Sequence, residues 1–312
     1  MSEYKYSIEA KNVNKVFYKK SSAVDALIDF SIKIEKGTIH GLLGPNGAGK
    51  STFINILGGL VKKNSGEVNI CGINIDKNTK LSKFKIGIVP QELNIDPFFS
   101  PAELLELQAG LYGVPKKNRR TEEILENLKL TDQRNAYART LSGGMRRRLL
   151  IGKALVHDPE IIILDEPTAG VDIDIRSSVW RYIKRISKQG KTICLTTHYL
   201  EEAENLCDNI SIINFGKKII EGSKNDLLNI ISTKSVAFVL TKNVDIPNEL
   251  NEFKPILSKN ILKLNYDKNK TNIKKIIDIL NNNNIDFLEI NTNEGDLEDV
   301  FKKVVKSNDI KS

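Results

Sequence analysis

The segment GPNGAGKST at residues 44–52 constrains the fold of this chain more than any other feature. It follows the short apolar stretch TIHGLLG, which predicts a buried strand, and it opens STFINILGGL, which predicts a helix. Phosphate loops with the pattern G-x-x-x-x-G-K-[ST] occur between a strand and a helix, because their backbone N–H groups and the helix start surround an anion. The sequence therefore predicts an α/β domain with a nucleotide site, in which Lys50 reaches the outer phosphates and Ser51 binds Mg²⁺.

A second stretch, IIILDEPTAGVD at 161–172, supplies carboxylates for the same kind of site. Four apolar residues place Asp165 at the carboxyl end of a buried strand, the edge at which open α/β sheets bind ligands. Asp165 is then expected to hold Mg²⁺ through water. Glu166 is left as the neighbouring carboxylate that polarises an attacking water molecule.

Composition limits the alternatives. A chain of 312 residues with 40% hydrophobic content can bury one large core and a smaller one. Cys71, Cys194 and Cys207 lie far apart without C-x-x-C spacing, so they are expected to be small core residues in a reducing cytoplasm. The start MSEYKYSIEA lacks the apolar stretch of a signal peptide, and no run approaches the roughly 20 apolar residues of a membrane span.

The net charge of +8 could suggest nucleic acid or an anionic surface as partner. However, the chain is rich in lysine, asparagine and isoleucine throughout, and arginine is absent after Arg185. This bias is interpreted as general composition, so no nucleic-acid partner is expected.

The patterns along the chain indicate two domains. Strands at 161–165 and 192–197 are each followed by a helical pattern, which predicts a parallel core sheet of βα units, and residues 101–130 are predicted to be helical. After about residue 230, the order strand, strand, helix, strand and helix predicts a small α+β module. Its last helix carries one apolar stripe, formed by Leu297, Val300, Phe301, Val304 and Val305.

Three further stretches invite a functional interpretation. Gln91 in VPQE and His198 in LTTHYLEEAE each end a predicted strand, at the edge where a γ-phosphate would lie. LSGGM at 141–145 is a second glycine turn before a helix. The three arginines that follow it, 146–148, point in different directions around a helix, so they are expected to form a solvated face rather than to contact one phosphate together.

In their order, GPNGAGKST, VPQE, LSGGM, IIILDEP, AGVD and TTH resemble the ATP-binding subunit of an ABC transporter, over about residues 6–230. The resemblance implies a phosphate-loop NTPase of ABC type, with a mixed core sheet, an antiparallel β subdomain and a helical subdomain at about 92–158. The predicted domains are therefore 1–230, the ATP-binding domain, and 231–312, the small α+β C-terminal module.

The resemblance also assigns site residues for ATP and Mg²⁺. Glu166, His198 and Gln91 are the implied catalytic residues, and Ser51, Gln91 and Asp165 the implied Mg²⁺ ligands. ATP would be bound by Gly44, Asn46, Gly47, Gly49, Lys50, Ser51 and Thr52. Phe17 would stack under the adenine, with Tyr18 as the alternative, and Asp172 would belong to the loop that follows the acidic pair.

LSGGM acquires a role through the same resemblance. Ser142, Gly143 and Gly144 would face the γ-phosphate of ATP held by a second subunit, adding donors and a helix dipole to an anion already bound by that subunit's phosphate loop. One chain holds one copy of each half, so a head-to-tail homodimer would close two sites at once.

The stretches TAGVDIDIRSSVW, LTTHYLEEAE and LEDVF resemble the bacterial exporter branch of the family, whose ATPases serve separate membrane permeases. The chain is thus expected to be cytoplasmic and bound to the inner face of the membrane through a permease. An importer ATPase is the alternative, since importers share all six motifs. An ABC-type ATPase acting on nucleic acid or ribosomes is a weaker one, because Lys50 and Ser142 lie too close for an inserted coiled coil and only one such domain is present.

Overall fold

The computed structural model describes residues 4–19, 22–170, 173–230, 233–242, 244–293 and 296–309. The chain divides into two compact units, residues 1–223 and 224–312. The division falls ahead of the boundary near residue 230 that the sequence suggests.

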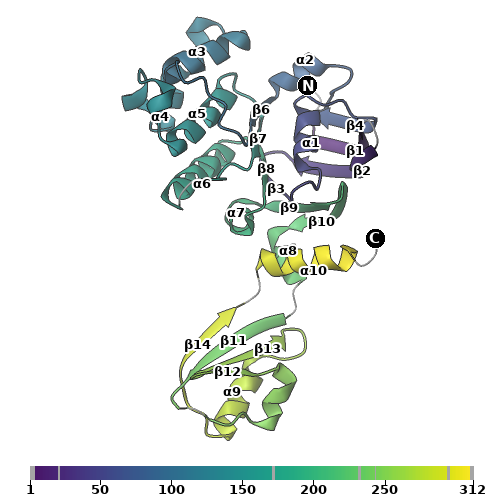
Figure 1. Cartoon of the computed structure of the whole chain (residues 1–312), viewed down its shortest axis with the longest axis vertical. Helices are drawn as coiled ribbons and strands as arrows, with labels where there is room; N and C mark the ends of the chain where they lie inside the picture. Colours follow the sequence, from purple (N-terminus) through teal and green to yellow (C-terminus); the bar gives the residue numbers. More distant parts are fainter. Residues whose placement is uncertain are drawn as a thin grey trace. The chain divides into compact units, whose positions relative to one another are not determined.

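The centre of the first unit is a sheet with the strand order β10-β9-β3-β8-β7-β6 (Figure 1). All neighbours are parallel except β10, which pairs antiparallel with β9, so the sheet is mixed as predicted. The inner strands β3, β7 and β8 are buried along almost their whole length because both faces of the sheet are covered. The strands are β3 Ile39–Leu43, β6 Ile86–Val89, β7 Ile161–Asp165, β8 Thr192–Thr197, β9 Asn209–Asn214 and β10 Lys217–Ser223.

A second, antiparallel sheet of the first unit has the order β2-β1-β4-β5. Its inward side chains share one core with helix α1 and the core sheet, and the rings of Phe30 and Phe53 meet there at 4.9 Å between centroids. This packing fixes the helix that begins at the phosphate loop. The elements are β1 Tyr6–Lys19, β2 Ser22–Glu35, α1 Lys50–Leu57, β4 Ser65–Ile70 and β5 Ile73–Asn74.

A helical layer follows β6 and has a leucine-rich core of its own (Figure 1). Its first helix starts with a capping box, in which Ser100 and Glu103 bond each other's backbone N–H. The layer contains α3 Pro101–Leu111, α4 Thr121–Asn127, α5 Gly143–Leu155 and the 3₁₀ turns Lys116–Asn118, Thr131–Gln133 and Ala138–Thr140. The other helices of this unit are α2 Thr79–Phe84, α6 Ile173–Lys188 and α7 Leu200–Leu206.

The second unit is an antiparallel sheet, β12-β13-β11-β14, with a separate core under α9. Leu297 and Val300 of the predicted stripe are buried, and α10 contacts α8 within this unit. The elements are α8 Lys224–Asn229, β11 Thr233–Leu240, a 3₁₀ helix Asn248–Phe253, β12 Ile256–Ser258, β13 Ile261–Asp267, α9 Ile273–Asn282, β14 Phe287–Asn293 and α10 Leu297–Asp309.

Two expectations from composition can be compared with the structure. All three cysteines are free and buried, as expected for small core residues. Burial raises the pKa of the Cys194 thiol to about 12 and that of the Cys71 thiol to about 11, so neither forms a thiolate at neutral pH. In the described part of the chain, no helix is long and apolar enough to cross a bilayer.

The separate cores predict that the first unit folds without the second. A chain ending after Ser223 keeps every strand of the core sheet, whereas an end near residue 230 would leave α8 without its contact to α10. The shorter chain is expected to unfold in one cooperative transition and to bind ATP like the full chain. Chemical denaturation and calorimetry measure both properties, and loss of cooperative unfolding would place the domain boundary elsewhere.

Candidate nucleotide site

Four strand ends converge at one edge of the core sheet. Strand β3 leads into the phosphate loop, β6 into Gln91, β7 ends at Asp165 before Glu166, and β8 leads into His198. These strands are parallel, so their carboxyl ends meet at the same edge. The structure therefore brings the phosphate loop, the acidic pair, the glutamine and the histidine to one place, as expected from the sequence.

The glycines of the phosphate loop meet two different needs. Gly49 has φ +109°, and a Cβ there would lie 2.5 Å from the Ala26 carbonyl oxygen, so no larger residue fits. Gly47 has φ +80° and open space where a side chain would stand. Of residues 47 to 51 in the described chain, only Ala48 donates its N–H to a backbone carbonyl outside the helix, that of Pro45. The loop thus presents backbone donors at the start of α1, as a phosphate group requires.

Lys50 is held above this loop. Its ammonium group donates to the carbonyls of Gly44 at 2.7 Å and Pro45 at 3.0 Å, and the residue is only 6% exposed. Burial lowers the pKa of Lys50, while the carboxylates of Glu166 and Asp165 act in the opposite direction. The cation lies between the loop and the acidic pair, which is where the outer phosphates of a nucleotide would need it.

Glu166 lies at the centre of the polar cluster. It is 5% exposed, and its backbone has φ +48°, an uncommon conformation for a residue with a side chain. Its Oε2 accepts from Gln91 Nε2 at 2.8 Å, and its Oε1 lies 3.0 Å from His198 Nδ1. The side chains that follow β6 and β8 therefore fix the orientation of the one carboxylate expected to receive a proton.

Thr196 contacts both acidic residues. Its hydroxyl donates to Asp165 Oδ1 and accepts from the Glu166 N–H, while its carbonyl accepts from the same N–H at 3.0 Å. Thr196 is not among the site residues predicted from the sequence, although it begins the stretch TTH that ends at His198. Its contacts fix the Asp165 carboxylate at the strand end and the backbone of Glu166 beside it.

The residues assigned to Mg²⁺ fit that ion chemically. Ser51, Gln91 and Asp165 offer a hydroxyl, an amide and a carboxylate oxygen, the hard donors that Mg²⁺ prefers alongside phosphate oxygens and water. Among the residues that the structure describes, no three His, Cys, Asp or Glu side chains form a metal-binding group. The donor set thus suits an ion that shares its ligands with a nucleotide.

The second glycine turn begins α5. Ser142 is the N-cap residue, and its Oγ accepts from the Met145 N–H at 3.3 Å. Gly143 has open space where a Cβ would stand, whereas Gly144 is buried. The turn therefore combines a helix start with an approachable glycine backbone.

The expectation of a solvated face at residues 146–148 was wrong for Arg147. This side chain is only 2% exposed, and it donates to the carbonyls of Pro90 at 2.9 Å and Gln91 at 2.8 Å. Arg147 shares a helix face with the buried residues Gly144 and Ile151, three before it and four after it. It connects α5 directly to the backbone that carries Gln91. Arg148 is also partly buried and donates to the Leu128 carbonyl at 2.6 Å.

The stacking residue under the adenine stays a prediction. Phe17 is 38% exposed and Tyr18 78% exposed, and as neighbours in β1 they point to opposite faces of the strand. The Lys15 ammonium lies 4.8 Å from the centroid of the Phe17 ring. Asp172 lies outside the described residues.

The arrangement is that of a phosphate-loop ATPase: a lysine-bearing loop at a helix start faces an oriented carboxylate across the ends of parallel strands. Residues 27–169 match the sequence profile of the ABC transporter family. The linearmycin resistance ATP-binding protein LnrL of Bacillus subtilis is 43% identical over 70% of this chain and 70% of its own length. The Nod factor export ATP-binding protein I of Cupriavidus metallidurans is 40% identical over 71% of this chain and 72% of its own.

Solved structures agree with this fold. A dimeric ATP-binding cassette in a post-hydrolysis state with ADP and phosphate is 30% identical, with a TM-score of 0.63 over 69% of this chain and 98% of that one. The protein cbiO1 of Clostridium perfringens, part of an ABC transporter complex, is 27% identical, with a TM-score of 0.65 over 72% of this chain and 92% of its own. The chain belongs to the ABC transporter family, as an ATP-binding subunit that hydrolyses ATP.

Proposed function

We propose that this chain powers an ABC exporter with a separate permease. The observation that carries the proposal is the 40–43% identity to subunits named for linearmycin resistance and for Nod factor export. The sequence stretches that resemble the exporter branch agree with it. Import remains the second candidate, since the six motifs are common to both directions.

In the proposed reaction, Lys50 and the loop N–H groups hold the phosphates, and Glu166 accepts a proton from the attacking water. Gln91 and His198 orient the Glu166 carboxylate through their hydrogen bonds to its two oxygens. Ser51, Gln91 and Asp165 would hold Mg²⁺, which offsets phosphate charge when bound. Gly44, Asn46, Gly47, Gly49 and Thr52 complete the proposed ATP contacts.

The proposed active form is a head-to-tail homodimer. Ser142, Gly143 and Gly144 would then approach the ATP held by the second subunit, where the start of α5 adds favourable partial charge. The dimeric ADP-bound cassette that this chain resembles supports such an assembly. In such a dimer, each ATP site is complete only when both chains contribute their residues to it.

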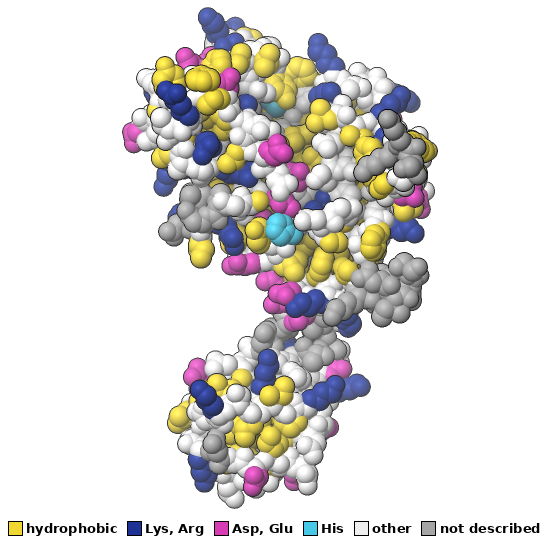
Figure 2. All heavy atoms as spheres, viewed as in Figure 1, with side chains coloured by type: hydrophobic (Ala, Val, Ile, Leu, Met, Phe, Trp, Pro, Cys, Tyr) yellow, Lys and Arg dark blue, Asp and Glu magenta, His cyan; other side chains and the backbone are white. Residues whose placement is uncertain are grey.

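The permease is expected to contact the helical layer. Figure 2 shows hydrophobic side chains gathered over the part of the first unit where α3 lies. Phe98, just ahead of α3, and Leu111, the last residue of α3, are 68% and 75% exposed. Arg147 connects α5 to the Gln91 backbone, so movement at the nucleotide has a direct route to this layer. Membrane association would then arise through the permease.

Lys50→Ala is expected to weaken ATP binding by at least about tenfold, because charge-assisted hydrogen bonds to phosphate contribute about 1.5 to 3 kcal/mol each. Lys62→Ala is the matched control, because Lys62 is an exposed lysine that follows α1, the helix that begins at Lys50. Calorimetric titration with ATP measures both variants. Unchanged affinity in Lys50→Ala would exclude this loop as the nucleotide site.

The export proposal is tested by purifying the native complex from membranes and identifying the chain that co-purifies. Inverted membrane vesicles with ATP outside are then expected to accumulate the substrate of an exporter. Accumulation in the opposite direction would favour the importer alternative. Co-purification with ribosomes or DNA, without a membrane protein, would contradict both transport candidates.

A further inference from the structure

A cavity of about 210 Å³ lies between α6 and the helical layer, away from the nucleotide site. Its lining contains Lys129, Arg148, Arg181 and Arg185, and none of its lining residues is acidic. The volume far exceeds the roughly 10 to 15 Å³ of such space that one water needs. Four cations therefore line a space large enough for a polyatomic ligand, and this space opens to solvent because Lys129, Arg181 and Arg185 are exposed. The nearest carboxylates, Glu123 and Asp158, line the adjoining pocket on the other side of Arg185.

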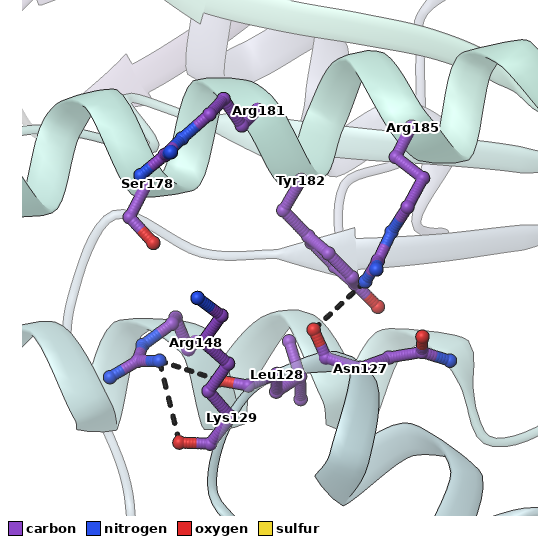
Figure 3. A pocket seen from close by; sticks show the side chains of 8 residues that line it. All are labelled: Asn127, Leu128, Lys129, Arg148, Ser178, Arg181, Tyr182 and Arg185. Atoms are coloured by element: carbon purple, nitrogen blue, oxygen red, sulfur yellow. Dashed lines mark hydrogen bonds between the residues drawn. The ribbon is translucent and has the colours of Figure 1, made fainter.

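The cations come from both sides of the cavity (Figure 3). Arg181 and Arg185 belong to α6, Arg148 belongs to α5, and Lys129 follows α4 with its ammonium directed toward α6. Among the described residues, none of the four forms an ion pair with a carboxylate. Ser178 and Tyr182 of α6 add hydroxyl donors between these charges.

Capping of α4 explains only part of this cluster. Arg185 donates to the Asn127 carbonyl at 2.8 Å, and Arg148 donates to the Leu128 carbonyl, so both guanidinium groups bind carbonyls at the C-terminal end of α4. Each guanidinium has five N–H donors, which leaves others available. Lys129 and Arg181 donate their side-chain groups to no acceptor in the described chain. The four side chains therefore carry more positive charge than capping of α4 requires.

We propose that this cavity is a binding site for a phosphate-bearing anion that bridges α6 and the helical layer. Guanidinium groups suit phosphate because their N–H donors match its oxygens in pairs, and Lys129 supplies a compact charge from the opposite wall. The ligand is either a free phosphate compound or the headgroup of an anionic lipid. In both cases the same side chains recognise the phosphate.

The test measures binding of inorganic pyrophosphate by calorimetry in magnesium-free buffer, with every chain compared in a Lys50→Ala background that weakens anion binding at the phosphate loop. The pocket variant is Lys129→Gln with Arg181→Gln, which leaves the α4 cap intact. The control variant is Lys184→Gln with Lys188→Gln, which removes two exposed α6 charges outside the cavity. Pyrophosphate affinity is expected to fall at least tenfold in the pocket variant and to stay unchanged in the control.

A second arm uses vesicles of phosphatidylcholine with or without phosphatidylglycerol. Binding only to the anionic vesicles, with the same dependence on Lys129 and Arg181, would identify a lipid headgroup as the source. The proposal is overturned if wild type binds neither probe, if the pocket variant binds like wild type, or if the control variant loses as much affinity. ADP affinity, measured separately, reports on folding and on the nucleotide site. If the double variant loses affinity for ADP, the single variant Arg181→Gln is used in its place.

Discussion

Glu166→Gln is expected to lower ATP hydrolysis by about 10²- to 10⁴-fold while ATP binding survives. The amide keeps the size of the carboxylate but cannot accept a proton from water. Binding is retained because the phosphates depend on the loop and Lys50, and the proposed Mg²⁺ ligands do not include Glu166. Steady-state hydrolysis and equilibrium ATP binding, measured on the same preparation, separate the two effects.

The same variant is expected to accumulate as a closed dimer. Each ATP would contact both chains, and hydrolysis is the step that releases those contacts. On a sizing column at low salt, Glu166→Gln is expected to elute as a dimer with Mg²⁺-ATP and as a monomer with ADP. Glu92→Gln, an exposed carboxylate beside Gln91, is the control and should behave like wild type. A Glu166→Gln chain that binds ATP normally yet stays monomeric would remove the main support for a shared site.

The convergence of Gln91, Glu166 and His198 could be predicted because it follows from local patterns. Each residue ends an apolar strand, and parallel strands bring their carboxyl ends to one edge. The hydrogen bonds among the three could not be predicted, since they depend on the positive φ of Glu166 and on Thr196. The motif therefore indicates which side chains gather, whereas the packing decides how the carboxylate is oriented.

The burial of Arg147 shows where sequence reasoning failed. Three consecutive arginines are typical of an exposed face, and nothing in their order marks the middle one. Arg147 is buried because α5 packs against β6, which places its guanidinium beside two carbonyls that lack strand partners. Such a contact between distant segments becomes visible only in the folded chain. The assignment of the short helix α8 to the second unit could not be predicted either. Its six residues are too few to form a sequence pattern that places them in one unit or the other.

Ser142→Arg is expected to leave ATP binding near wild type and to lower hydrolysis by at least about 10²-fold, the usual cost of losing one donor at a reacting oxyanion. The substitution places a long cation at the start of α5, where the turn would approach the partner's γ-phosphate. It also removes the cap to Met145 N, which is worth about 0.5 to 2 kcal/mol of stability. Ser142→Ala removes that cap without the bulk, so comparing the two variants separates helix destabilisation from obstruction of the interface.

Mixing two inactive variants tests the shared site directly. In a dimer of Lys50→Ala with Ser142→Arg, one site receives both defects, and the other joins an intact phosphate loop to an intact second glycine turn. Random pairing makes about half of the dimers mixed, with one intact site each, so about a quarter of wild-type sites should return. Hydrolysis in the mixture is therefore expected to rise well above that of either variant alone. If Lys50 and Ser142 of the same chain served one ATP, every site would keep a defect, and mixing would restore nothing even where a tag shows that mixed dimers form.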